Sequence, residues 1–266
     1  MNIVICINRI PDPEMPPKQF KLNENTGRPI LQGVNWVIGP FDENALETAL
    51  QLKDSSGAKL TALTVGPAEN QEALRRTLAL KCDRAVHVKV EKTGELDSAG
   101  VAAVLAAAIR KLGDADLVLF GRQVGDWDGG QVGQLVAEEL GYSCVTAGRS
   151  VEPIGNESVR VPKEVAGGIA VVEAQLPSVV TITNTSTNQL RIPKVRDAMA
   201  AFKVPITTWS PAEVGADVDG LASSPRVEVQ RLFIPESDVQ VDMITGDSDE
   251  VIAEQLAKRI LGLKVL

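Results

Sequence analysis

The most constraining feature of this 266-residue chain is the stretch between Asp116 and Leu140. It begins with an apolar run at residues 117–120, which has the length of a strand buried on both faces. A glycine-rich segment follows, and beyond Gln131 the apolar residues recur with helical spacing. The stretch therefore predicts a strand, a glycine-rich turn and a helix in that order.

A strand, a glycine-rich turn and a helix together favour a phosphate-binding site. The first N–H groups of a helix lack partners within the helix, and the helix dipole attracts negative charge. The segment has neither the G-x-G-x-x-G dinucleotide fingerprint nor the Gly-Lys-Ser/Thr of a P-loop. Two interpretations stay open. Either Asp126 and Asp128 hold the ribose hydroxyls of a nucleotide, or they cap a turn whose glycines serve backbone geometry alone.

Strands and helices alternate along the first half of the chain. The predicted strands are residues 2–8, 59–65, 85–90 and 117–120, and the predicted helices begin after residues 39–42, cover 69–81, and begin after Asp97 and Gln131. This alternation predicts an α/β fold with a mostly parallel, doubly wound sheet. Ligands of such sheets bind beyond the carboxyl ends of the strands, near the reversal of strand order. The turns after Asn8, Val65 and Phe120 are therefore expected to line one crevice.

The sequence pattern changes after Gly141. Residues 158–164, 169–175 and 178–183 are predicted as short strands added to the sheet in antiparallel orientation, and residues 226–235 as a last strand. Residues 212–225 have the composition of a loose linker, and residues 248–263 that of an amphipathic helix. We expect a nucleotide-binding domain over residues 1–215 and an extended C-terminal arm over 216–266 that packs on a partner subunit. The isolated chain is expected to be poorly behaved.

Composition argues against several classes of function. A net charge of −8 disfavours nucleic acid as a partner, because phosphate contacts need a basic face. No apolar run has the length of a membrane span, and residues 1–4 enter a strand, so a cytoplasmic protein without membrane insertion is expected. We interpret Cys6, Cys82 and Cys144 as buried reduced thiols. The single histidine, His87, gives no basis for a metal site, and no catalytic nucleophile or general base stands out.

Six motifs in order resemble the beta subunit of electron transfer flavoprotein, from residue 1 to about 215. They are CINRIPD (6–12), GPFDENALE (39–47), VGPAE (65–69), GRQVGDWDGGQVGQ (121–134), KEVAGG (163–168), and LPSVVTIT with LRIPKVRDAMAA (176–201). The resemblance implies an electron carrier that passes electrons between flavoprotein dehydrogenases and an acceptor. It implies a heterodimer whose alpha subunit holds most of a redox-active FAD. It also implies a buried adenine nucleotide in this chain, which we expect to be AMP; the alternative is a second FAD, as in electron-bifurcating members.

The resemblance also assigns site residues. The positions matching the family's cofactor site are Arg9, Ile10, Gly39, Phe41, Asp42, Val65, Gly66, Gly121, Asp126, Asp128, Gly129, Gly130, Gln131, Val132 and Gly133. Gly39 replaces the usual asparagine, and Pro13 replaces an aromatic residue of classical members. A segment at 188–201 matches the docking site for a dehydrogenase, with Val195 as anchor and Met199 beside it. Glu164 matches an acidic residue that limits how the flavin domain swings.

An ATP-binding stress-type module is a competing class that shares the alternating framework. Gly130 and Gly133 fit the start of its G-x-x-G motif, but Ser143 occupies the position of its later glycine. An ATP pyrophosphatase-type adenylating enzyme needs a Ser-Gly-Gly-x-Asp-Ser loop after the first strand, and residues 8–11 do not supply it.

Overall fold

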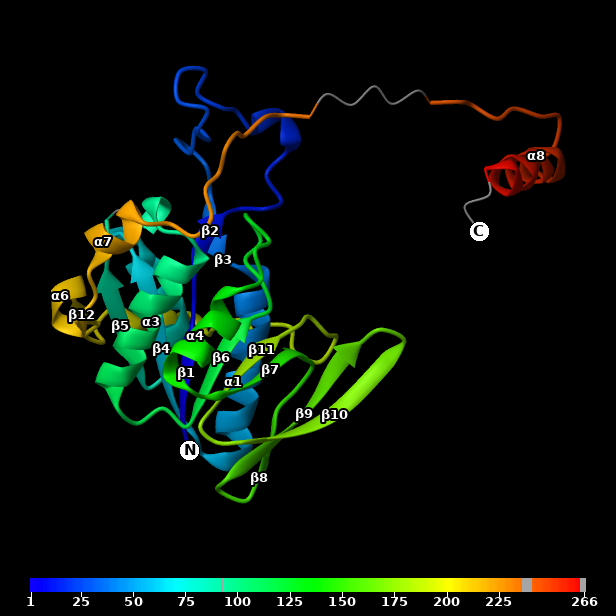
Figure 1. The fold of residues 1–266 in the computed structure, drawn as a ribbon. Coiled ribbons are helices and arrows are strands. Elements are labelled where there is room, and N and C mark those ends of the chain that lie inside the picture. Colours follow the sequence, from blue (N-terminus) through cyan, green and yellow to red (C-terminus); the bar gives the residue numbers. More distant parts are fainter. Residues whose placement is uncertain (92, 236–240, 264–266) are drawn as a thin grey trace.

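A ten-stranded sheet forms the centre of the molecule, which is described by a computed structural model over residues 1–91, 93–235 and 241–263 (Figure 1). The strand order is β10-β9-β7-β11-β6-β1-β4-β5-β12, and β8 pairs with β9. The strands are β1 Asn2–Cys6, β4 Lys59–Gly66, β5 Arg84–Lys89, β6 Leu117–Gly121, β7 Ser143–Gly148, β8 Glu152–Ile154, β9 Ser158–Val165, β10 Gly168–Gln175, β11 Ser178–Ile182 and β12 Thr207–Trp209. A second, two-stranded sheet joins β2 (Arg9–Pro11) to β3 (Trp36–Ile38).

Helices cover both faces of the large sheet and create two apolar cores. Leu46 of α1 and Leu74 of α2 are buried in one core, whereas Ile109 of α3 and Val136 of α4 are buried in the other. This arrangement confirms the predicted doubly wound α/β fold. The helices are α1 Pro40–Ser56, α2 Gln71–Ala79, α3 Ser98–Leu112, α4 Val132–Leu140, α5 Val195–Ala201, α6 Pro211–Val214, α7 Val218–Ser223 and α8 Asp249–Gly262, with single 3-10 turns at Pro17–Gln19, Ala68–Asn70 and Thr93–Glu95.

Strand order reverses beside β1. After β1 the chain forms β4 and β5, which lie in the sheet on one side of β1. It then crosses back to form β6, which lies in the sheet on the other side of β1. Ile3 lies opposite Leu60 of β4 and Leu117 of β6, and both pairings are parallel. The turns that follow β1 and β6 therefore flank the switch point at which doubly wound sheets bind ligands.

The position of β11 corrects one expectation. Residues 178–183 are expected to add in antiparallel orientation, but β11 is parallel to both β6 and β7 and lies between them. All five of its residues are buried, as is usual for a parallel strand covered on both faces. β9 and β10 do form an antiparallel pair, as expected.

The segment predicted as a loose linker contains two short helices, so that prediction is wrong. Ser210 and Glu213 form a capping box at the start of α6. Asp217 caps α7 by accepting the N–H of Gly220 at 3.0 Å. Capping side chains satisfy the free N–H groups of a helix start, and both motifs are present in the sequence.

The predicted last strand, residues 226–235, is also absent. This segment is extended but pairs with no strand among the described residues. Instead, the N–H groups of Arg226 and Val227 donate to the carboxylate of Asp97 at 2.7 and 3.1 Å. Asp97 also caps α3, as predicted, by accepting the N–H of Gly100 at 2.8 Å.

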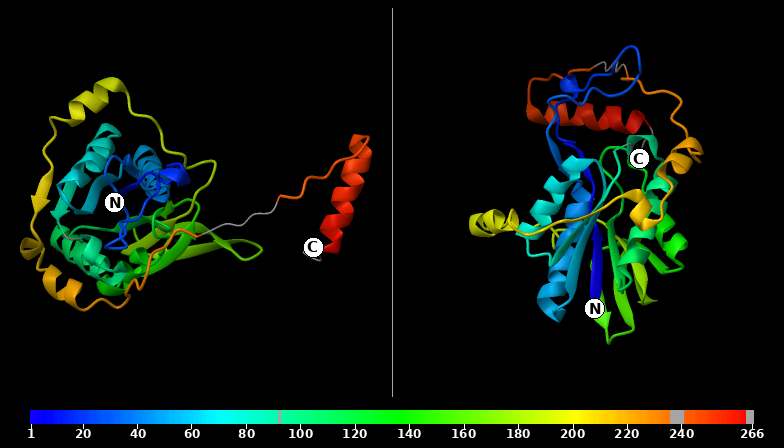
Figure 2. Two further views of the ribbon diagram at one scale, coloured as in Figure 1. Left: turned by 90° about the horizontal axis from the view of Figure 1, so that it is seen from above. Right: turned by 90° about the vertical axis from the view of Figure 1, so that its left-hand side faces the viewer.

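The C-terminal helix α8 lies apart from the α/β body, as Figure 1 and the left-hand view of Figure 2 show. None of its residues is buried, and Ser248 caps its start, so the predicted helix over residues 248–263 is confirmed. The division at residue 215 stays a prediction, and residues 236–240 and 264–266 of the predicted arm lie outside the described residues.

The cysteine interpretation is correct at two positions of three. Cys6 and Cys82 are buried. Cys144 is exposed, because it lies at the start of β7, which becomes buried only from Val145 onward. His87 is fully buried on β5. No helix in the described part of the chain is both long and apolar enough to cross a membrane.

Candidate functional site

A buried carboxylate joins the two strand ends at the switch point. Asp42, in the first turn of α1, accepts the N–H of Asn8 at 2.8 Å and the N–H of Gly121 at 3.1 Å. Burial raises the pKa of Asp42 to about 7, although the two backbone hydrogen bonds act in the opposite direction. Asp42 therefore fixes α1 against the ends of both β1 and β6.

Close packing around Asp42 explains Gly121. A Cβ atom on Gly121 would lie 2.6 Å from Asp42 Oδ1 and 2.7 Å from the backbone of Phe41. Glycine at this position therefore lets the start of α1 approach the end of β6. At Gly39 the packing is looser, because a Cβ atom there would lie 3.3 Å from Asp42 Oδ2 and 3.9 Å from Cδ1 of the buried Ile10.

The glycine-rich turn between β6 and α4 is stabilised from within. Asp128 accepts a hydrogen bond from Gln123 Nε2 at 2.8 Å, and Asp126 accepts the N–H of Trp127 at 2.9 Å. Gly130 has a φ of +58°, in the left-handed region that disfavours other residues. Burial raises the pKa of Asp126. Both aspartates thus stabilise the turn, and their contact with a nucleotide stays a prediction.

Gly133 lets the start of α4 pack closely on the sheet. A Cβ atom there would lie 2.6 Å from Cγ2 of Thr181 and 3.4 Å from Cβ of Phe120. Val132 packs into the apolar core, whereas Gln131 is the N-cap and forms no side-chain capping bond. The N–H groups of this first turn have no partner within the helix and lie at the carboxyl edge of the sheet.

The end of β4 forms the next part of this edge. The side chain of Val65 is buried, so that only its backbone is available to a ligand. A Cβ atom on Gly66 would lie 2.2 Å from Nδ2 of Asn70, and no other residue fits there. The carbonyl of Gly66 accepts the N–H of Val90 at 2.9 Å and lies 2.8 Å from Nε2 of His87, whose pKa is lowered by burial.

Two arginines stack on aromatic rings at the same edge. The guanidinium of Arg9 lies 4.8 Å from the ring centroid of Trp36, and its Nη2 lies 2.8 Å from a carboxylate oxygen of Glu72. Arg122 lies 4.6 Å from the ring centroid of Phe41. Sequence reasoning did not single out Arg122, although a basic residue directly after a strand end in a glycine-rich turn is a recognisable signal.

Of the predicted docking residues, Val195 and Met199 are exposed, whereas Glu164 is half-buried and lies on a separate surface. Val195 and Met199 project from α5, which packs on α2. Glu164 lies on β9 near the opposite edge of the sheet, where its carboxylate is 2.9 Å from Arg149. The structure also exposes Ile192 and Phe202 beside α5, which the sequence reasoning did not name. Glu164 is therefore not part of the surface that contains Val195.

The turns after β1 and β6 thus flank the switch point of a doubly wound α/β domain, beside the start of α4, and the turn after β4 lies at the same carboxyl edge of the sheet. This arrangement defines the general class of nucleotide-binding folds. The family model for the electron transfer flavoprotein domain matches residues 30–214. The chain therefore belongs to the electron transfer flavoprotein family.

Three relatives match nearly the whole chain. The caffeyl-CoA reductase–Etf complex subunit CarD of Acetobacterium woodii is 34% identical over 263 residues, which cover 98% of both chains. Protein FixA of Azorhizobium caulinodans is 33% identical over 268 residues, covering 96% of this chain and 93% of FixA. The electron transfer flavoprotein subunit beta of Megasphaera elsdenii is 33% identical over 277 residues and covers both chains completely. These matches support an electron-transfer role of the beta-subunit type.

Proposed function

We propose that this chain is the beta subunit of a heterodimeric electron transfer flavoprotein and binds the adenylate part of a nucleotide at the β1/β6 switch point. The observation that carries the proposal is Asp42, which links the turn after β1 to the turn after β6. The backbone amides of residues 129–133 would hold the phosphate, because glycines at 129, 130 and 133 leave the backbone accessible. A wall beside it would consist of Arg9, Ile10, Gly39, Phe41, Asp42, Val65, Gly66 and Gly121.

The flavin shared with the alpha subunit would supply the redox chemistry when bound. This chain would position and shield the cofactors, and it would pass electrons between a flavoprotein dehydrogenase and an acceptor in the cytoplasm without making or breaking a substrate bond. Substrate turnover by the isolated chain, without flavin, would overturn this part of the proposal.

The nucleotide itself is AMP or a second FAD, and both contain the same adenylate. AMP requires the crevice and the glycine-rich turn alone. The second candidate, FAD, needs more room, and the 59% exposed side chain of Trp127 in the glycine-rich turn is not packed against other parts of the chain. Denaturing the purified heterodimer and counting flavin decides between them. One FAD and one AMP per pair support AMP, whereas two FAD without AMP support an electron-bifurcating member.

The surface beside α5 is the proposed docking site for the flavoprotein dehydrogenase. Its apolar side chains follow each other at intervals of three, four and three residues and are all more than two-thirds exposed: Ile192, Val195, Met199 and Phe202. We call these four side chains the docking stripe. Lys194, Arg196 and Lys203 flank it, although the whole chain carries a net charge of −8. This combination fits a partner with an apolar pocket and an acidic rim.

The arm is the proposed contact with the alpha subunit. Ile252, Leu256 and Ile260 recur at intervals of four and therefore lie on one side of α8, and the helix buries none of its residues in this chain. An amphipathic helix of this kind gains stability by placing its apolar side on another surface. Glu164, on the separate hairpin of β9 and β10, is proposed to limit movement of the flavin domain.

A further inference from the structure

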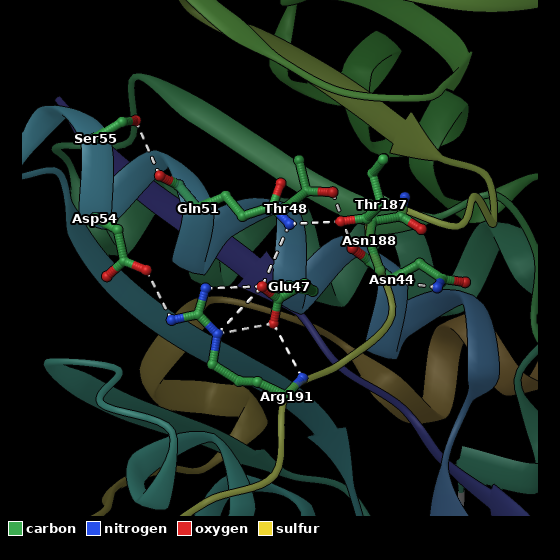
Figure 3. Close-up of polar contacts among 9 residues, drawn as sticks. All are labelled: Asn44, Glu47, Thr48, Gln51, Asp54, Ser55, Thr187, Asn188 and Arg191. Carbon is green, nitrogen blue, oxygen red and sulfur yellow. Dashed lines mark hydrogen bonds and ion pairs between the residues drawn. The ribbon is translucent and has the colours of Figure 1, made fainter.

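One side of α1 carries a stripe of polar residues at intervals of three, four and three (Figure 3). Residues with this spacing lie on one face of a helix. The stripe faces residues 184–194, which have no regular secondary structure and contain Ile192, the first residue of the docking stripe. Its members are Asn44, Glu47, Gln51 and Asp54.

Side chains of this polar stripe bind the backbone of the irregular segment. Nδ2 of Asn44 donates to the carbonyl of Asn188 at 3.0 Å, and Nε2 of Gln51 donates to the carbonyl of Thr187 at 2.7 Å. The helix thereby supplies partners that a neighbouring strand would otherwise provide. The path of the segment is fixed by α1 and by the buried side chain of Asn188, which accepts the N–H of Thr185 at 2.8 Å and donates to the carbonyl of Thr183 at 2.9 Å.

Arg191 is the centre of this attachment (Figure 3). Its Nε donates to both carboxylate oxygens of Glu47 at 3.1 and 3.0 Å, its Nη2 donates to Oε1 at 2.7 Å, and its backbone N–H donates to Oε2 at 3.1 Å. Its Nη1 donates to Asp54 at 2.7 Å. The Glu47 side chain is only 6% exposed, so Arg191 neutralises a buried charge. These carboxylates raise the pKa of Arg191 above its usual range.

A second attachment holds α5 on α2. Lys81 Nζ lies 2.6 Å from a carboxylate oxygen of Asp197, and Nη1 of Arg75 donates to the carbonyl of Ala201 at 2.8 Å. The docking stripe is therefore fastened by ionic and polar contacts on both sides, while its apolar side chains remain exposed.

We propose that Arg191 is a positioning residue for partner docking, which holds the segment that leads into the docking stripe in one conformation before the partner arrives. Ordering a loop in advance removes part of the entropy that binding would otherwise lose. The proposal rests on the proposed docking function of α5. It assigns to Arg191 no contact with the partner or with the cofactors.

The test uses the complete heterodimer and a purified flavoprotein dehydrogenase from the same source, reduced by its own substrate. KM and kcat for electron transfer are measured for Arg191→Met, for Arg191→Lys and for the double variant Glu47→Gln/Arg191→Met. Arg110→Met is the matched control, because Arg110 of α3 forms an ion pair with Glu139 of α4, away from the docking stripe. Tryptic cleavage after Lys194 reports the order of the segment in each variant.

We expect Arg191→Met to raise KM about tenfold with kcat unchanged and to accelerate cleavage after Lys194. Arg191→Lys should have a KM between those of Arg191→Met and the unchanged chain, because lysine reaches one carboxylate but lacks the planar fork of arginine. The double variant should regain thermal stability, since no unpaired carboxylate is buried, but should keep the raised KM. That combination separates positioning from a general loss of stability.

The same KM for Arg191→Met and Arg110→Met would overturn the proposal. So would a double variant in which KM recovers together with thermal stability. Val195→Ala distinguishes the docking function of α5 from the positioning role of Arg191. If Val195→Ala raises KM and Arg191→Met does not, only the positioning role is lost. If Val195→Ala leaves KM unchanged, the docking function of α5 fails, and the role of Arg191 fails with it.

Discussion

Asp42 Oδ1 accepts the backbone N–H of Gly121 at 3.1 Å, although 79 residues separate the two along the chain. The other carboxylate oxygen of Asp42 accepts the N–H of Asn8. The start of α1 and the ends of two adjacent strands are thereby held as one unit. The candidate nucleotide site depends on this unit, because each of its turns leaves the sheet there.

Asp42→Asn should weaken this link. An amide carries one oxygen and one NH2 group, so one of the two backbone N–H groups loses its acceptor. We expect the free energy of unfolding to fall by about 1–3 kcal/mol and the copurified nucleotide to decrease. Urea unfolding and nucleotide content measure the two effects. The exposed Asp114, changed to Asn, is the control; an equal change in both variants would contradict the account.

The titration of Asp42 should be visible in the pH dependence of stability. Its pKa is raised to about 7 in the folded chain, against about 4 when unfolded. The folded state therefore binds the proton more tightly than the unfolded state. The resulting contribution to the free energy of unfolding is fully present below about pH 4 and is lost as the pH rises through 7. Relative to that of Asp42→Asn, the free energy of unfolding of the parent chain should rise by about 1 kcal/mol per pH unit when the pH is lowered from 7 to 5. Parallel pH profiles would refute this.

Gly130→Val should remove the nucleotide. A β-branched residue at a φ of +58° is strained by about 1–3 kcal/mol, and its side chain would lie beside the proposed phosphate. Gly141→Val is the matched control, because Gly141 has a φ of +69°, has open space around it and lies at the other end of α4. Both variants should lose similar thermal stability, but only Gly130→Val should purify without nucleotide. Undiminished nucleotide in Gly130→Val would show that the turn is not the site.

Much of the fold is predictable from the sequence because apolar spacing and capping residues are local signals. The pairing of β11 is not, since the sequence of Ser178–Ile182 shows that the strand is buried but not which neighbours it receives. The role of Asp42 is hidden for a similar reason, because its partners lie far away in the chain. The polar stripe beginning at Asn44 is visible as a pattern. Its partner, the segment ending at Arg191, is known only from the structure.

Val195→Asp should impair docking. Val195 is 78% exposed, and a carboxylate there would enter the apolar pocket of the partner without a counter-charge. We expect KM for the dehydrogenase to rise more than tenfold, with unchanged thermal stability and nucleotide content. Val171→Asp on β10 is the control, because Val171 is also exposed. Equal effects of the two substitutions would argue against a specific docking stripe.

Removal of residues 236–266 should prevent stable assembly. α8 has no buried residues within this chain, so its loss should leave the α/β body folded, as circular dichroism would show. Size-exclusion chromatography with the coexpressed alpha subunit should show dissociation of the pair. A shortened chain that forms the heterodimer as well as the complete one would show that the arm is not the interface.

The most direct test of the central claim is the total number of adenine nucleotides in the purified heterodimer. The complex is denatured, the released nucleotides are separated by chromatography, and adenylate is counted per pair of chains. We expect two adenylates, one from the FAD held mostly by the alpha subunit and one from the switch point of this chain. A single adenylate per heterodimer would contradict it.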